Sequence, residues 1–206
     1  MKTVKMTLLA TALVASFATI QTAQAEVSGN VALTSNYIWR GVTQNMEDPA
    51  IQGGFDLETK SGFYAGVWGS SVDFGGDEST EIDVYAGYGL ELGGVGLDFG
   101  AIAYTYHGGD SASGDFEEIY AGVSFAGFGL TYSVGLDDAD DNIELSYGYD
   151  FENVSIGAVY GDYDSYSYYS ASVSTELSGI GFDLTVADTD EDDSDTQVAF
   201  TISKSL

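Results

Sequence analysis

The chain lacks cysteine altogether and has one proline, one histidine and five basic residues among its 206 positions. The absence of cysteine excludes disulfide bonds, thiolate metal sites and thiol catalysis. The 33 acidic residues give a formal net charge of −28, which makes an anionic nucleic acid an unfavourable partner. No apolar run after the first 25 residues approaches the length of about 18 residues that a transmembrane helix requires.

Residues 1–25 have the pattern of a secretory signal peptide. Lys2 and Lys5 provide the charged start, an apolar run follows, and small residues suited to cleavage end at Ala25. We therefore predict a signal peptide over residues 1–25 and one exported domain over residues 26–206. Without Lys2 and Lys5 that domain keeps 33 acidic and three basic residues, a formal charge of −30.

Apolar and polar residues alternate with a period of two almost throughout the exported domain, which indicates β-strands with two unlike faces. Val84 and Leu90, for example, share one phase, and Asp83 and Glu91 share the other. Six of these segments have 9–13 residues, about the length with which a tilted strand crosses a bilayer. We predict twelve strands, at 27–39, 51–58, 63–68, 81–92, 95–106, 119–125, 128–136, 143–151, 154–160, 169–177, 180–186 and 198–202.

The predicted connections alternate between long and short. Gly93-Gly94 and Ser178-Gly179 are short, whereas residues 107–115 and the acidic residues 137–142 are long, and residues 162–165 also count as long. Outer-membrane barrels have short periplasmic turns and longer outer loops. The pattern predicts an all-β fold: a transmembrane, antiparallel, up-and-down β-barrel of 12 strands with long acidic outer loops.

Three features favour lipid contact for the apolar phase. It carries no Asp, Glu or Arg within the strand bodies, and the last strand stays in phase to Leu206, so that it can close the barrel. Aromatic residues on this phase also gather near strand ends, as in the interfacial girdles of membrane barrels. These residues are Phe63, Phe125, Phe128 and Phe151 near the short turns, and Tyr37, Trp39, Tyr160 and Tyr169 near the long loops.

Three segments resemble a known family. They are "SNYIWRGVTQ" (35–44), "DPAIQGGFD" (48–56) and "SGFYAGVWGSSVDFG" (61–75), in this order behind a signal peptide. Together they resemble the start of the TorF-type porins, a Gram-negative outer-membrane family formerly described as conserved proteins of unknown function. The resemblance implies a diffusion pore. It supplies neither a substrate nor a cofactor.

The polar phase would line the lumen, and its charges are almost all acidic. The Debye length at physiological salt is about 8 Å, comparable to the half-width of such a barrel, so screening does not remove this field. Rings of Asp and Glu favour cations. The predicted pore-lining residues are Arg40, Asp56, Glu58, Trp68, Glu81, Asp83, Tyr85, Glu91, Asp98, Tyr104, Glu118, Tyr120, Glu144, Asp150, Glu176 and Asp183.

Arg40 is the single arginine of the chain. Alternation puts it on the polar face near the outer loops, and we expect it to pair with an inward carboxylate. Such a pair could narrow the entrance of a pore. It could equally be a structural ion pair with no effect on transport.

The favoured function is a passive outer-membrane channel for small solutes, with a lumen that prefers cations and with outer-membrane lipid as its surroundings. One alternative is a structural or adhesive barrel with a plugged lumen. Another is a secreted soluble β domain, in which Val84, Leu97 and Ile156 would meet in a dry centre.

Two further hypotheses concern the loops. The acidic stretches 137–142 and 188–196 suggest weak binding of divalent cations, although neither has the EF-hand pattern and solvated acidic loops are a simpler interpretation. His107, with Ser111 and Ser113, suggests a lipid-hydrolysing rim site. No group is evident that would orient such a base, and we expect a protein that is not an enzyme.

Overall fold

The computed structural model describes residues 25–108 and 114–206. The predicted signal peptide, apart from Ala25, lies outside the described residues, and so do Ser111 and Ser113. Among the described residues, no helix is long and apolar enough to span a membrane.

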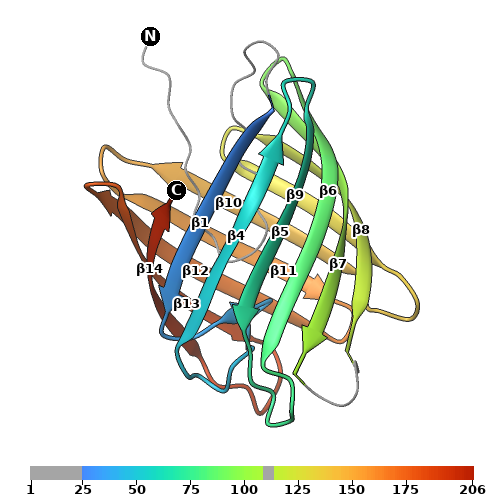
Figure 1. The fold of residues 1–206 in the computed structure, drawn as a ribbon, viewed down its shortest axis with the longest axis vertical. Helices are drawn as coiled ribbons and strands as arrows, with labels where there is room; N and C mark the ends of the chain where they lie inside the picture. Colours follow the sequence, from blue (N-terminus) through green and yellow to red (C-terminus); the bar gives the residue numbers. More distant parts are fainter. Residues whose placement is uncertain (1–24, 109–113) are drawn as a thin grey trace.

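Twelve of the described strands pair into a closed antiparallel barrel, as the sequence predicts (Figure 1). The strands follow one another around the wall in chain order, so each connection joins neighbours. In Figure 1 the strands are tilted, with β4, β5 and β6 running side by side. The wall consists of β1 (Glu26–Thr34), β4 (Ala50–Glu58), β5 (Phe63–Ser71), β6 (Thr80–Leu92), β7 (Val95–His107), β8 (Phe116–Phe125), β9 (Phe128–Gly135), β10 (Asn142–Asp150), β11 (Ser155–Tyr163), β12 (Tyr166–Leu177), β13 (Ile180–Thr189) and β14 (Gln197–Ser205).

The barrel closes through β1, which pairs with β4 on one side and with β14 on the other (Figure 1). With β4 the pairing extends along all of β1, from Glu26 opposite Glu58 to Thr34 opposite Ala50. With β14 it extends only from Asn30 opposite Ser205 to Thr34 opposite Thr201. This seam is therefore the shorter of the two pairings that β1 makes.

The apolar phase faces outward and the acidic phase faces inward. Val84 is 57% exposed and Ile156 is 41% exposed, whereas Asp83, beside Val84 in the same strand, is 2% exposed. A soluble barrel would show the reverse, because burial of apolar surface is what stabilises such a fold. The alternative of a soluble domain with a dry apolar centre is therefore wrong.

Aromatic side chains lie on the outer face near both ends of the wall. Phe63, Phe125, Phe128 and Phe151 are exposed beside the short turns, and Tyr160 and Tyr169 are exposed toward the opposite end of the wall, where the long loops lie. This distribution agrees with the predicted girdles at these six positions. Tyr37 and Trp39, predicted to belong to the outer girdle, do not: both lie off the barrel wall.

Two connections bear on the predicted alternation of long and short loops: one is short as predicted, and one is shorter than predicted. The Ser178-Gly179 turn has φ of 55° and 75°, the positive angles of the two-residue turns that suit the twist of antiparallel strands. The connection from β11 to β12, predicted to be long, is likewise a turn of two residues, Asp164 and Ser165. Tyr163 and Tyr166 pair across it, so Asp162 and Tyr163 of the predicted loop 162–165 belong to β11 instead.

The first predicted strand, 27–39, ends early. β1 stops at Thr34, and the chain then forms a two-stranded hairpin, β2 (Ile38–Trp39) and β3 (Val42–Thr43), which pairs with itself and not with the wall. Polar side chains compete here with the strand ladder: Thr34 Oγ1 donates to the carbonyl of Asn36 (2.8 Å). Alternation continues through the hairpin, which is why the sequence suggests one long strand.

Candidate channel interior

The hairpin turns at Arg40 and Gly41, between Trp39 and Val42. The φ angles of Arg40 and Gly41 are 46° and 84°, and Trp39 pairs with Val42, so this is a two-residue hairpin turn with both central residues in the left-handed region. Glycine adopts this region readily. Arginine does so at an energetic cost, and its contacts must compensate for that cost.

Side-chain amides fix the base of the hairpin. Asn45 Oδ1 accepts a hydrogen bond from the backbone N–H of Tyr37 (2.9 Å), and Thr43 Oγ1 donates to Asn36 Oδ1 (2.7 Å). Asn36 Nδ2 in turn donates to Gln197 Oε1 of β14 (2.9 Å). The hairpin therefore enters the barrel from the long-loop end with a defined direction.

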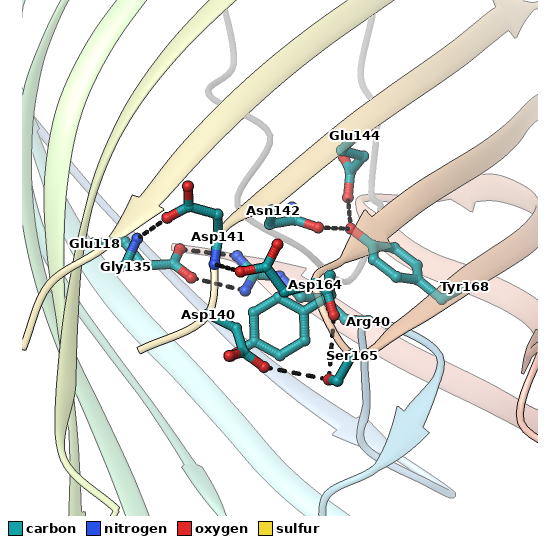
Figure 2. A network of polar contacts seen from close by, with 11 residues as sticks. Arg40, Glu118, Gly135, Asp140, Asp141, Asn142, Glu144, Asp164, Ser165 and Tyr168 are labelled. Carbon is teal, nitrogen blue, oxygen red and sulfur yellow. Dashed lines mark hydrogen bonds and ion pairs between the residues drawn. The ribbon is translucent and has the colours of Figure 1, made fainter. Parts of the chain in front are cut away.

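The Arg40 guanidinium forms a two-pronged ion pair with Glu118 of β8. Nη1 donates to Oε1 at 2.7 Å and Nη2 donates to Oε2 at 2.8 Å (Figure 2). The two side chains are 8% and 2% exposed. Burial lowers the pKa of Arg40, but the hydrogen bonds and charge of Glu118 outweigh it and leave the pKa above its ordinary value. The expected pairing with an inward carboxylate is confirmed, although Arg40 reaches it from the hairpin turn and not from the wall.

Aromatic rings enclose this ion pair. The guanidinium carbon of Arg40 lies 4.3 Å from the ring centre of Trp39 and 4.6 Å from that of Tyr163, within cation–π range. Trp39 also contacts Tyr104, Phe116 and Tyr163 edge-on, with ring centres 5.9, 6.1 and 5.5 Å away. Trp39 therefore points into the barrel, where it finds aromatic partners from three wall strands.

Tyr37 is also internal. It is 5% exposed, packs with Ala50 and Val72 and meets Trp68 of β5 edge-on at 5.4 Å. The prediction that Tyr37 and Trp39 face lipid is wrong because the chain leaves the wall before it reaches them. One sequence signal could have revealed this: Ile-Trp, then Arg-Gly, then Val-Thr has the form of a short hairpin around a turn that ends in glycine.

Tyrosine hydroxyls bind several of the internal carboxylates. The Tyr64 hydroxyl donates to Asp98 Oδ1 (2.7 Å) and lies 2.5 Å from the Tyr120 hydroxyl. Tyr85 donates to Asp56 in the same way. These bonds join β4 to β6, and β5 to β7 and β8, across the interior.

A second network joins β12 to β10. The Tyr168 hydroxyl donates to Glu144 Oε2 (2.8 Å) and contacts Asn142 Oδ1 (3.1 Å), beside the Arg40–Glu118 pair (Figure 2). Figure 2 also shows the loop residues Asp140, Asp141, Asp164 and Ser165 close to this group. Asn142, Tyr163 and Gln197 are not among the predicted pore-lining residues.

Four buried carboxylates each keep an oxygen without a hydrogen-bond partner among the described residues: Glu81 Oε2, Asp83 Oδ1, Asp150 Oδ2 and Asp183 Oδ2. Glu81 and Asp83 are 1% and 2% exposed. Unpaired buried carboxylate oxygens are costly. Glu81 and Asp83 lie at the long-loop end of β6, whereas Asp150 and Asp183 lie nearer the short turns, so uncompensated acidic groups occur in both halves of the interior.

The predicted pore-lining residues fall into three groups by their surroundings. Arg40 and Glu118 bind each other directly, and three exposed carboxylates, Glu58, Glu91 and Glu176, lie near the short-turn ends of their strands. The remaining residues are buried or half-buried on the inner face: Asp56, Trp68, Glu81, Asp83, Tyr85, Asp98, Tyr104, Tyr120, Glu144, Asp150 and Asp183.

The loop hypotheses gain nothing from the geometry. Over residues 25–108 and 114–206, no three His, Cys, Asp or Glu side chains come together as a metal site would require. His107 Nε2 lies 3.3 Å from Thr105 Oγ1, and no carboxylate bonds to its ring in that part of the chain.

Comparison with known proteins identifies the family. The sequence model of Gcw_chp, a bacterial protein family of unknown function, matches residues 18–205. The chain belongs to the Gcw_chp family. The TorF-type name suggested by resemblance remains a prediction. No curated protein matches this Gcw_chp chain in sequence.

Solved structures supply the fold of the Gcw_chp chain. It is similar to the KdgM porin with a TM-score of 0.64 and 11% identity, over 87% of this chain and 99% of the other. It is similar also to a KdgM porin in complex with disordered oligogalacturonate, with a TM-score of 0.62 and 10% identity, over 87% and 98%. At these identities the likeness shows a porin-type barrel.

Proposed function

We propose that this chain is a passive channel in the outer membrane of a Gram-negative bacterium, admitting small cationic and neutral solutes in preference to anions. The protein would reach that membrane through the cleaved leader predicted at residues 1–25. The observation that carries the proposal is the division of the barrel into an apolar outer face and an inner face whose charges are carboxylates, apart from Arg40. The porin-type fold supports a channel.

Charge near the short-turn end of the barrel supports the preference for cations. Glu58, Glu91 and Glu176 are exposed near the short turns, and Arg40, the single arginine, is neutralised by Glu118. Two lysines lie at this end: Lys60 in the turn after β4, and Lys204, which donates to the carbonyl of Gly179 on the outer side (2.8 Å). The three inward carboxylates outnumber Lys60. A solute that enters here meets a negative field.

The comparison with the KdgM porin sharpens the expectation. One KdgM structure contains oligogalacturonate, a chain of sugars that each carry a carboxylate. The acidic inner face of this barrel would repel such a polyanion. We therefore propose that this barrel does not pass such a polyanion despite the shared fold, and that it carries out no enzymatic step.

Reversal potential across a planar bilayer tests this proposal. In a salt gradient the wild-type channel should pass cations more readily than anions, and a permeability ratio in favour of anions would reject it. The matched variant Glu58→Gln/Glu91→Gln/Glu176→Gln keeps size and shape while removing the exposed charges. We expect its cation preference to fall towards unity. An unchanged ratio would show that these carboxylates do not set selectivity.

A second candidate, a structural or adhesive barrel with a plugged lumen, is favoured by the position of the hairpin 35–45 inside the wall. Single-channel recording separates the two. A folded wild-type barrel that never conducts, at any voltage or ligand concentration, favours the structural role, whereas resolved current steps favour the channel.

A further inference from the structure

The hairpin 35–45 reaches opposite walls of the barrel. On one side Tyr37 meets Trp68 of β5, and Arg40 meets Glu118 of β8. On the other side Ile38 packs with Ala187 of β13 and Ala199 of β14. At Gly41 an added Cβ would lie 2.8 Å from Tyr168 Cβ of β12, so no side chain fits there. The hairpin thus crosses the interior at the long-loop end.

The wall offers a preformed site for the guanidinium. Glu118 presents both carboxylate oxygens to the guanidinium, at 2.7 and 2.8 Å, and the Tyr163 ring lies 4.6 Å from the guanidinium carbon. Two parallel charge-assisted bonds and a stacked ring are the features by which proteins recognise planar cations. Both residues belong to wall strands and would stay in place if the hairpin moved.

The barrel does not need the hairpin in order to close. Thr34 and Ala50 are register partners in β1 and β4, so the wall is continuous across the point where residues 35–49 leave it. The Arg40 backbone is held in the left-handed region, a conformation that side chains with a Cβ disfavour. The turn is therefore maintained by what its side chain binds.

We propose that Glu118 and Tyr163 form a binding site for guanidinium-type organic cations, that Arg40 occupies it as an internal ligand, and that such solutes displace Arg40 and release the hairpin from the lumen. This inference rests on the proposed channel function for its physiological meaning only. The binding site itself can be tested without any current.

The required concentration follows from competition with a tethered group. A residue on a short loop acts on its site at an effective concentration in the millimolar range, and a ligand shifts the equilibrium only by binding the released state better. A free cation with the same fork must therefore reach roughly millimolar levels to displace Arg40. A cation without the fork should need far more.

Tryptophan fluorescence reports the position of the hairpin directly. The chain has two tryptophans, so Trp68→Phe leaves Trp39, which stacks on Arg40, as the single reporter. Methylguanidinium should shift the emission of Trp39 to the red and raise its quenching by acrylamide, whereas methylammonium at equal ionic strength should do neither. Equal effects of both cations, or no effect of either up to about a hundred times the millimolar estimate, would overturn the proposal.

The variant Glu118→Gln removes the charge while keeping the shape of the site. In the Trp68→Phe background its Trp39 should already emit as an exposed ring, with no further response to methylguanidinium. Because breaking a buried ion pair strongly disfavours the state that contains it, the ratio of released to inserted hairpin should rise by about a hundredfold or more. Circular dichroism confirms that the barrel is folded, and buried emission in a folded Glu118→Gln protein would contradict the proposal.

A hairpin-deleted barrel connects the site to transport. Replacing residues 35–49 with Asn-Gly joins the paired residues Thr34 and Ala50 through a two-residue turn. This barrel should conduct more than the wild type, and methylguanidinium should not raise its conductance further, because no hairpin is left to release. If the deleted barrel and the wild type had equal conductance, the hairpin would not obstruct the lumen. A folded, deleted barrel without any current would instead reject the channel function, leaving the fluorescence experiment to decide the binding site.

Discussion

Ala86→Arg would place a cation against lipid at the middle of the wall. Ala86 lies on the outer face, six residues from each end of β6 (Thr80–Leu92). At about 3.3 Å per residue and a tilt of about 40°, it is roughly 15 Å from either end of the strand. This depth is close to the midplane of an apolar band about 25 Å tall.

A cation at the midplane of such a barrel costs about 2–4 kcal/mol, and one near the interface costs about 0–1 kcal/mol. Urea titration of the protein in liposomes should therefore show a loss of about 2–4 kcal/mol in the free energy of unfolding for Ala86→Arg. Leu92→Arg, at the end of the same strand, should lose much less. Ala86→Leu, which keeps the site apolar, should lose nothing.

The difference in unfolding free energy between Ala86→Arg and Leu92→Arg tests whether the outer face contacts lipid. A protein surrounded by water tolerates most surface substitutions within about 0.5 kcal/mol. If Ala86→Arg costs no more than this, or no more than Leu92→Arg, the outer face does not contact lipid and the assignment of the apolar phase to the bilayer is refuted.

Two stability predictions concern the interior. Asp98→Ala removes the acceptor of the Tyr64 hydroxyl and should lower the free energy of unfolding by about 1–3 kcal/mol in the same titration; an unchanged value would mean that water replaces the carboxylate at no cost. Gly161→Ala should cost about 1–3 kcal/mol by overpacking, because its Cβ would overlap the Tyr168 ring. Gly157→Ala, facing only the movable Ser172 hydroxyl at 2.7 Å, should cost less, and the reverse order would contradict the packing argument.

The wall could be predicted from the sequence because its determinants are local. A strand between lipid and an aqueous or polar interior needs one apolar and one polar face. Because successive side chains in a strand point to opposite faces, the neighbours Val84 and Asp83 must lie on different faces. Turn residues such as Ser178-Gly179 mark where each strand ends. The number of strands and their order follow from these two signals. The outward direction of the apolar face also required the absence of Asp, Glu and Arg from the apolar phase, the aromatic residues near the strand ends and a last strand that can close the barrel.

The hairpin could not be predicted in the same way. Tyr37 and Trp39 continue the alternation of the first strand, and their true partners, Trp68 and Tyr163, lie in other strands. Whether an aromatic residue meets lipid or the far wall depends on barrel width and stagger, which no single segment encodes. The pairing of Tyr64 with Asp98 across β5 and β7 was hidden for the same reason.

The short seam between β1 and β14 has a consequence for assembly. Thr34 and Thr201 lie 167 positions apart, the kind of remote contact that forms slowly because the intervening chain must first be ordered. Until Asn30–Thr34 pairs with β14, the two edge strands of a nascent barrel expose unpaired backbone N–H and C=O groups to the hydrocarbon of the membrane. Substitutions that weaken the few hydrogen-bonded pairs between β1 and β14 should therefore slow membrane insertion and leave the barrel open, even when all the other strand pairs form.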